Sequence, residues 1–228
     1  MIILAAGSGK RMAGVAADKL LLPLNGKNAW LYGWESIESS GIADAYWVVY
    51  RDSEQRVALE SSLAQLAISK PIEWVVGGAE RMDSVYAALE VIPAAFEWVF
   101  IHDAARPLIH CESILALQQA VIANDAAVLA KRPKDTLKRI PLAVADQQAC
   151  HLEDLDRSRL WAVETPQAFR RELIAGAYRK VREKGIAITD DTAALEVISH
   201  PVAVVENRFP NPKLTTPDDI PLLSALKL

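Results

Sequence analysis

The hydrophobic residues of the chain follow two alternating patterns. Short runs that are rich in β-branched and aromatic residues predict buried strands, and longer segments with an apolar residue every three or four positions predict helices. The predicted strands cover residues 1–5, 45–50, 72–76, 98–102, 126–130 and 202–205. Because these runs are continuously apolar, we expect parallel strands that helices cover on both faces.

Helical patterns lie between the predicted strands. The clearest apolar stripes are formed by Ile114, Leu117 (or Gln118), Val121 and Ile122 in one segment and by Phe169, Leu173, Ala177 and Val181 in another. Gly41 and Gly185 stand where such helices would end, since glycine readily takes the left-handed conformation of a helix C-terminus. The alternation predicts an α/β fold of three layers, α/β/α, around a mostly parallel sheet.

Residues 131–165 interrupt this alternation. They contain no clear helix, begin with several basic residues and include a strand-like stretch at 159–163. A loop of this length without structure is unusual inside a compact domain. We therefore expect a single domain, 1–228, with an extended β-arm inserted at about 132–164 that packs on a second copy of the chain. A surface loop is the alternative.

Composition narrows the range of functions. Of the 228 residues, 51% are hydrophobic and 24% are charged, as in ordinary globular proteins. The 25 basic and 29 acidic side chains give a net charge of -4, which argues against general nucleic-acid binding, since that needs a basic excess on one face.

Location is predicted from what the sequence lacks. We expect no membrane span, because no apolar run approaches the roughly 20 residues that a bilayer requires. The first apolar run is too short for a signal peptide and has no basic residue before it. Cys111 and Cys150 stand alone, without the spacing of a metal site or a redox pair. We therefore expect a cytoplasmic protein with reduced thiols.

The turn after the first predicted strand carries candidate phosphate-binding residues. Gly7 and Gly9 flank Ser8, and glycines let backbone N–H groups approach a phosphate chain. The sequence fits neither the Walker A loop nor the dinucleotide fingerprint. The cations that follow, Arg11 and Lys19, would stabilise the negative charge that builds up when a nucleoside triphosphate is attacked. An ordinary turn with solvated cations is the alternative.

Two further strand ends carry small and charged residues. Gly77 and Gly78 follow the third predicted strand, and Ser84 can form a hydrogen bond near the start of the next helix. Asp103 and Arg106 follow the fourth strand, where a carboxylate would meet a ribose or magnesium and an arginine a phosphate. A salt bridge between these two residues is the alternative. Since open α/β sheets bind ligands at the carboxyl ends of their strands, the three turns predict one nucleotide site.

The chain resembles the 2-C-methyl-D-erythritol 4-phosphate cytidylyltransferases through motifs that are spread over almost its whole length. These motifs are LAAGSGKRM (4–12), Lys19, GG (77–78) through Arg81 to Ser84, HDAARP (102–107), DTLK (135–138), TPQ (165–167), TDD (189–191) and NPKLT (211–215). The resemblance implies a Rossmann-like nucleotidyltransferase sheet with a dimerising β-arm. It also implies an enzyme that transfers a cytidylyl group from CTP to methylerythritol phosphate with Mg²⁺.

The resemblance implies roles for individual residues. Arg11 and Lys19 would stabilise the transition state, while Arg157 and Lys213 would hold the incoming phosphomonoester for in-line attack. The arm residue Thr136, with Arg157, would reach the pocket of the neighbouring subunit in a homodimer.

The same resemblance supplies the remaining candidates. Thr189 and Arg106 would also position the substrate. The nucleotide would be bound by Ala5, Ala6, Gly7, Gly9, Gly78, Arg81, Ser84, Asp103 and Ala104. Asp103 is in addition the candidate protein ligand of Mg²⁺.

Two rival functions stay open on the sequence. A cytidylyltransferase for another sugar-alcohol phosphate, such as ribitol 5-phosphate, would share every nucleotide-binding residue, and the acceptor-side residues do not separate substrates that differ by one methyl branch. A non-catalytic nucleotide sensor is the second rival, although it would have no need for Arg11 and Lys19. The four histidines, His102, His110, His151 and His200, are assigned no chemical role.

Overall fold

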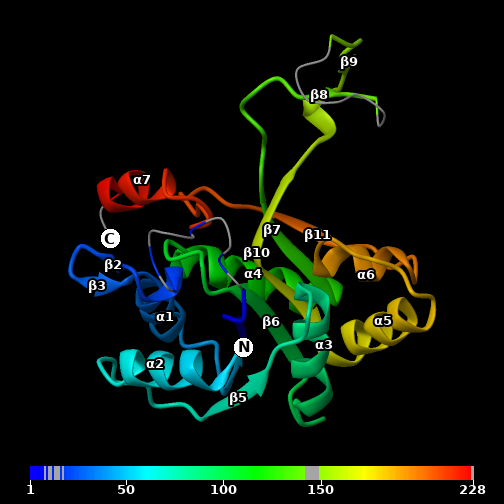
Figure 1. Ribbon diagram of the computed structural model, residues 1–228. Helices are drawn as coiled ribbons and strands as arrows, with labels where there is room; N and C mark the ends of the chain where they lie inside the picture. The colour runs from blue at the N-terminus through cyan, green and yellow to red at the C-terminus, as the bar shows by residue number, and fades with distance from the viewer. Residues whose placement is uncertain (8, 10–11, 13–15, 17, 142–148, 227–228) are drawn as a thin grey trace.

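The computed structural model describes residues 1–226 apart from 8, 10–11, 13–15, 17 and 142–148. Within this part of the chain, seven strands form one sheet in the order β11-β7-β10-β6-β1-β4-β5 (Figure 1). Their bounds are Ile2–Leu4 (β1), Tyr46–Tyr50 (β4), Ile72–Val76 (β5), Trp98–Asp103 (β6), Ala126–Lys131 (β7), Ala162–Arg170 (β10) and Ala203–Glu206 (β11). The six predicted strands are confirmed, and their ends differ from the prediction by at most one residue.

The sheet is parallel except for one strand. β1 pairs in parallel with β4 and β6, β4 pairs in parallel with β5, and β7 does so with β11. β10 lies between β6 and β7 and is antiparallel to both. The carboxyl ends of the other six described strands therefore share one edge of the sheet.

The strand-like stretch at 159–163 reaches only the start of β10, because Pro166 lies in the middle of the strand and proline cannot donate a hydrogen bond to a neighbouring strand. The pairing of β10 with β7 is irregular between Val163 and Gln167, so the proline falls where the ladder is already interrupted. The predicted helical stripe that started at Phe169 is wrong at that residue. Phe169 belongs to β10, and the next helix begins at Arg171.

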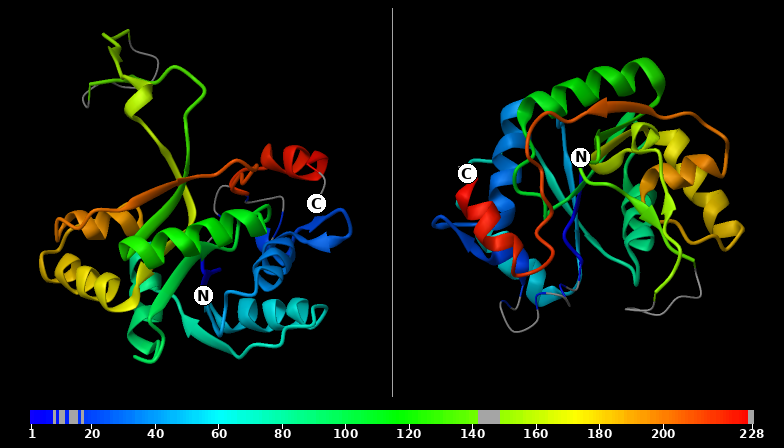
Figure 2. Two further views of the ribbon diagram at one scale, coloured as in Figure 1. Left: turned by 180° about the vertical axis from the view of Figure 1, so that it is seen from behind. Right: turned by 90° about the horizontal axis from the view of Figure 1, so that it is seen from above.

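Helices cover both faces of the sheet (Figure 2). One face carries α1 (Ala29–Ser40), α2 (Ser53–Leu63), α4 (Cys111–Asn124) and α7 (Asp219–Ala225). The other carries α3 (Arg81–Val91), α5 (Arg171–Glu183) and α6 (Asp191–Glu196). The three-layer α/β/α architecture is thus confirmed.

The helices contact the sheet through the predicted apolar stripes, with one exception. In α4, Ile114, Leu117 and Val121 are fully buried, whereas Ile122 is 56% exposed and does not belong to the buried stripe. One residue advances a helix by about 100°, so Ile122 is turned away from the sheet when Val121 faces it. Gly41 ends α1 with a φ of 68°, as predicted for a helix C-terminus.

The described residues 132–141 and 149–161 leave the body between β7 and β10, and we call them the arm (Figures 1 and 2). Near its tip, β8 (Lys138–Arg139) pairs with the antiparallel strand β9 (Glu153–Asp154). The predicted strand at 159–163 is displaced. Arg159 lies in a 3₁₀ turn, Arg157–Arg159, and the strand starts at Ala162.

Two small elements lie at the edge of the body. A 3₁₀ turn, Lys19–Leu21, precedes a two-stranded ladder of β2 (Pro23–Leu24) and β3 (Lys27–Asn28).

Among the residues that the structure describes, no helix combines the length and the apolar character needed to cross a membrane.

Candidate active site

A cavity of about 370 Å³ lies at the carboxyl ends of β1, β4, β5 and β6. It is lined by Leu4, Ala5, Ala6, Gly7, Lys19, Leu20, Arg51, Gly78, Ala79, Glu80, Arg81, Ser84, Asp103, Ala105 and Lys213. This is the edge at which open α/β sheets bind ligands. The three turns that the sequence analysis singled out therefore meet in one cavity.

Close backbone packing brings the turns together. The Gly77 N–H donates to the carbonyl of Tyr50 at 2.7 Å, and the Gly78 N–H donates to Ser84 Oγ at 3.1 Å. A Cβ atom on Gly77 would lie only 2.6 Å from the Cβ of Ala6. A side chain at position 77 would therefore push the turn after β5 away from the turn after β1, which explains the glycine there.

Asp103, the last residue of β6, is paired with two cations. Arg81 Nε lies 3.3 Å from its Oδ1, and Lys213 Nζ lies 2.5 Å from its Oδ2. Burial acts to raise the pKa of Asp103, but the charges of Arg81 and Lys213 outweigh it and hold the pKa well below its usual range. The carboxylate therefore stays ionised and keeps two cations at the cavity.

Arg81 is held from its other side by Asp191. Its two terminal nitrogens donate to the Asp191 carboxylate at 2.9 and 2.7 Å in a bidentate pair. Asp191 is fully buried, and the Tyr178 hydroxyl donates to it at 2.6 Å. Residues of α3, α5 and α6 thus fix the position of one guanidinium in the cavity wall.

Lys19 and Lys213 reach the cavity from opposite ends of the sequence. The Lys19 ammonium donates to the carbonyl of Leu214 at 2.9 Å, and the Leu214 N–H donates to the carbonyl of Ala105 at 2.8 Å. The segment that carries Lys213 therefore also supports Lys19. Such a pair of ammonium groups beside a guanidinium is suited to a ligand that carries several negative charges.

The predicted site residues fall into four groups, and the acceptor-side candidates Thr136, Arg157 and Thr189 form the one that is described last. Those that line the cavity are Ala5, Ala6, Gly7, Lys19, Gly78, Arg81, Ser84, Asp103 and Lys213. Those that lie nearby without lining it are Gly9, Ala104 and Arg106. The prediction for Arg11 falls outside the described residues.

Arg106 supports the cavity from the loop after β6. Its guanidinium donates to the carbonyl of Asn211 at 2.7 Å, two residues before Lys213. The alternative of a direct salt bridge between Asp103 and Arg106 is not realised among the described ion pairs, because the Asp103 oxygens are paired with Arg81 and Lys213. Arg106 therefore holds the segment that carries Lys213.

Three acceptor-side candidates lie away from this cavity. Thr136 and Arg157 are exposed on the arm, where the Arg157 guanidinium donates to the carbonyl of Lys134 at 2.6 Å. Thr189 is exposed in the turn before α6, two residues from Asp191. The structure does not bring these three residues into the cavity of their own chain.

Arg51 is the main lining residue that the sequence analysis missed. It directly follows β4, and its guanidinium NH1 lies 3.7 Å from Asp18 Oδ2. The rule that ligands bind after the ends of parallel strands applies to this strand as well. Inspecting the turn after the second predicted strand would therefore have found it.

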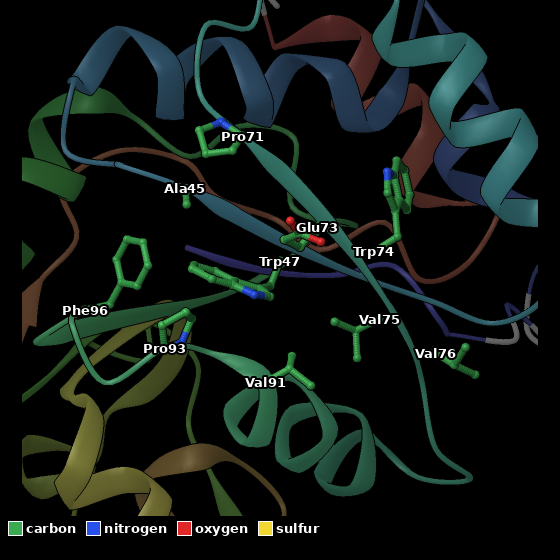
Figure 3. Close-up of a pocket in the computed structure, with 10 residues that line it drawn as sticks. All are labelled: Ala45, Trp47, Pro71, Glu73, Trp74, Val75, Val76, Val91, Pro93 and Phe96. Atoms are coloured by element: carbon green, nitrogen blue, oxygen red, sulfur yellow. The ribbon is translucent and has the colours of Figure 1, made fainter.

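A larger groove of about 550 Å³ lies along β5 and the end of α3 (Figure 3). Trp47, Trp74 and Phe96 contribute its aromatic surface, and of the residues that line it Glu73 alone is charged. A phosphate chain would find no cation in this lining. The smaller cavity, which contains Lys19, Arg81 and Lys213, is the better candidate for an anionic ligand.

A metal ion that is held by the protein alone needs several donor side chains close together. No three His, Cys, Asp or Glu side chains of the described part form a metal-binding group. Asp103 is a carboxylate in the cavity, but each of its oxygens is paired with a cation. Mg²⁺ typically takes one or two carboxylates together with substrate phosphates and water. A magnesium ion here would therefore depend mainly on oxygens of a bound ligand.

The whole chain matches one known family. The sequence model described as "IspD: 2-C-methyl-D-erythritol 4-phosphate cytidylyltransferase" covers residues 1–226. A relative of that name from Bacillus velezensis is 39% identical over 227 residues, which are 99% of this chain and 94% of the relative. A chloroplastic relative from Oryza sativa is 34% identical, over 99% of this chain and 73% of its own length.

Solved structures agree with the sequence comparisons. The crystal structure of 4-diphosphocytidyl-2C-methyl-D-erythritol synthase from Anaerococcus prevotii superposes with a TM-score of 0.83 at 26% identity, covering 98% of this chain and 95% of the other. A cytidylyltransferase structure from Francisella tularensis gives a TM-score of 0.74 at 28% identity, covering 97% and 95% of the two chains.

Proposed function

The chain belongs to the 2-C-methyl-D-erythritol 4-phosphate cytidylyltransferase family, and we propose that the cavity lined by Lys19, Arg81 and Lys213 is its active site. The enzyme transfers a cytidylyl group from CTP to methylerythritol phosphate in isoprenoid synthesis. A phosphate oxygen of the acceptor attacks the α-phosphorus of CTP, and the bond to the β-phosphate breaks to release pyrophosphate. The convergence of three cations at the ligand edge of the sheet carries the proposal.

The turn after β1 and the turn after β5 would hold the nucleotide. The backbone from Ala5 to Gly9 would surround the triphosphate. The Ala5 N–H itself donates to the carbonyl of Val49, so the N–H groups that follow it would form the concavity that binds the anion. Gly78 and Ser84 would contact the cytosine, and Asp103 and Ala104 the ribose. The close packing of Gly77 on Ala6 supports this arrangement, since it places the two turns side by side.

Lys19 would stabilise the charge that develops during the transfer, together with Arg11. As the acceptor attacks, negative charge grows on the α-phosphate and on the leaving pyrophosphate. An ammonium that is already positioned lowers this barrier without having to reorganise. The hydrogen bond from Lys19 to the Leu214 carbonyl supports such a fixed position.

The acceptor would be held by residues of two subunits. Lys213, Arg106 and Thr189 would come from the body of one chain, and Thr136 and Arg157 from the arm of a partner in a homodimer. Holding two anions together requires cations that offset their repulsion. The exposure of Thr136 and Arg157 on a projecting arm supports this division. The predicted cytoplasmic location is part of the same proposal.

Mg²⁺ would enter with CTP. Its main ligands would be triphosphate oxygens and water, as is usual for this ion. Asp103 is the candidate protein ligand, and it would have to exchange Lys213 or Arg81 for the metal at one oxygen. When bound, the ion would neutralise part of the triphosphate charge. The rest of the neutralisation would come from Lys19 and its neighbours.

The proposal is tested by the dependence of pyrophosphate release on the acceptor. We expect purified protein with CTP and Mg²⁺ to release pyrophosphate only when methylerythritol phosphate is added, and chelation of Mg²⁺ to stop it. The matched assay contains ribitol 5-phosphate. Faster turnover with ribitol 5-phosphate would transfer the assignment to the related cytidylyltransferases, and CTP binding without turnover on either acceptor would indicate a sensor.

A further inference from the structure

Gln55 is a buried polar residue on the core-facing side of α2. The buried positions of this helix are Gln55, Leu59, Ser62 and Leu63, which recur with helical spacing. Gln55 is only 3% exposed. An amide at such a position is costly unless its hydrogen bonds are satisfied, so the partners of this side chain indicate why it is there.

All of its partners belong to segments that line the candidate active site. Gln55 Nε2 donates to the carbonyl of Ala5 at 3.0 Å and to Asp18 Oδ2 at 2.5 Å. Gln55 Oε1 accepts from the N–H of Arg51 at 2.7 Å. One side-chain amide thus uses both of its donor positions and its acceptor on three separate segments.

Two of these segments are the ends of the turn after β1, residues 5–18, which carries Gly7 and Gly9 and which we call the glycine turn. Ala5 stands where the chain leaves β1, and Asp18 directly precedes Lys19. The third, Arg51, follows β4 and lines the same cavity. Gln55 therefore holds the start of the turn, its end and the neighbouring strand end at fixed distances from one another.

Asp18 in turn fixes the position of the segment that carries Lys19. Asp18 Oδ1 accepts from the Leu20 N–H at 3.0 Å and thereby caps the 3₁₀ turn whose first residue is Lys19. Gln55 itself is anchored by its backbone, because its N–H donates to Asp52 Oδ1 at the start of α2 at 2.8 Å. The chain of contacts runs from a helix end, through Gln55 and Asp18, to the turn that carries the lysine.

We propose that Gln55 is a positioning residue that holds Lys19 and the two ends of the glycine turn, Ala5 and Asp18, in their catalytic arrangement. This inference rests on the role proposed above for Lys19. The amide is required by its partners, since Ala5 and Asp18 both present acceptors and Arg51 presents a donor. A glutamate would place a carboxylate against two acceptors. A leucine would leave the Ala5 carbonyl and the Arg51 N–H without this partner and would remove one donor from Asp18.

The first test compares three variants of the full-length enzyme. Gln55→Leu keeps the approximate size of the side chain and is expected to lower kcat by about 10- to 100-fold, because a small misplacement of a catalytic group has effects of this order. The KM for methylerythritol phosphate should stay unchanged. Glu54→Gln, an exposed change in the same helical turn, is the matched control and should behave like the wild type.

Lys19→Ala is the reference variant. If it keeps the wild-type kcat, the role of Lys19 is wrong, and its positioning by Gln55 is wrong with it. If Lys19→Ala is slow while a folded Gln55→Leu keeps the wild-type kcat, only the positioning role is overturned.

A second test remains decisive if Gln55→Leu fails to fold. Gln55→Glu should lose kcat and regain part of it as the pH falls, because one proton shared with Asp18 restores a donor between the two carboxyl groups. Adding Asp18→Asn to Gln55→Glu should restore several-fold of the loss at neutral pH, since the new amide can donate to the new carboxylate. A double variant as slow as Gln55→Glu, with the pH profile of the wild type, would overturn the proposal.

Discussion

His102 is a buried, neutral imidazole next to Asp103 of the candidate active site. Its Nε2 lies 3.2 Å from the carbonyl of Arg106, which can only accept, so Nε2 carries the proton. The Thr165 hydroxyl then donates to Nδ1 at 3.3 Å and accepts from the Asp103 N–H at 3.0 Å. Burial lowers the pKa of His102 to about 4, although the neighbouring Asp103 charge acts to raise it. His102 therefore stabilises the end of β6 through these hydrogen bonds.

This pKa predicts a loss of stability in mild acid. The unfolded chain binds a proton at His102 near pH 6.5 and the folded chain only near pH 4, so stability is complete above pH 6.5 and declines as the pH falls through this window. Between pH 7.5 and pH 5 we expect this histidine to reduce the free energy of unfolding by about 2 kcal/mol.

Urea unfolding at the two pH values measures the effect. His102→Gln removes the titrating group, so its free energy of unfolding should change less between pH 7.5 and pH 5 than that of the wild type. An equal change in both proteins would show that other groups cause the pH dependence.

At the residue scale, the sequence identified the main charged groups of the cavity. Lys19 and Asp103 were predicted from the turns after two strands and Lys213 from the resemblance to a known family, and all three line one cavity. Gln55 was not found, because a lone glutamine on a helix has no local signal. Its function depends on Ala5 and Asp18, which are 50 and 37 residues away in the sequence.

At the scale of elements, the wall of the cavity depends on three helices that meet at Asp191. This residue begins α6, its carboxylate pairs with Arg81 at the start of α3, and Tyr178 of α5 donates to it. The sequence analysis noted the motif at 189–191 but assigned no role to Asp191. The pair joins residues 110 positions apart, so only the packed fold brings it together.

Removing the charge of Asp191 should weaken both the fold and the site. Asp191→Asn leaves the half-buried Arg81 without its bidentate partner. We expect the free energy of unfolding to fall by about 3 kcal/mol. We also expect the KM for CTP to rise, because Arg81 lines the cavity. Tyr178→Phe is the graded comparison, because it removes one hydrogen bond and leaves the ion pair, so a loss of about 1 kcal/mol is expected.

Chemical denaturation and steady-state kinetics of the two variants provide the measurements. If Asp191→Asn were no more damaging than Tyr178→Phe in both, the ion pair would contribute little to the position of Arg81.

At the scale of the whole molecule, the proposed acceptor site is divided between body and arm. The sequence predicted the arm from the absence of a helix between two strands, but only the start of β10 was predicted, because Pro166 lies in the middle of this strand. Thr136 and Arg157 lie on the arm, and Lys19 and Lys213 lie in the body. A site shared by two subunits therefore predicts that defects in body and arm complement each other.

Mixed dimers test this division. Lys19→Ala and Arg157→Ala chains should each be slow at low acceptor concentration. Co-expressed, they should recover about a quarter of the wild-type rate, because half of the dimers are mixed and each mixed dimer has one intact site.

The matched control pairs Lys19→Ala with Lys213→Ala. Both changes are in the body, so no mixed dimer has an intact site, and no recovery is expected. Recovery in this control, or none with Arg157→Ala, would contradict a site built from two chains.

The reversed direction of β10 determines where the arm can emerge. β7 ends at the ligand edge of the sheet, and an antiparallel strand has to start at the same edge, where Ala162 lies opposite Lys131. The two ends of the arm are therefore held together by the antiparallel pairing of β7 and β10, as in a hairpin. Replacing it with a tight turn, or grafting an arm of another length, would leave the hydrogen-bonded core unaltered. The arm can thus diverge between lineages while the sheet that carries the candidate site is retained.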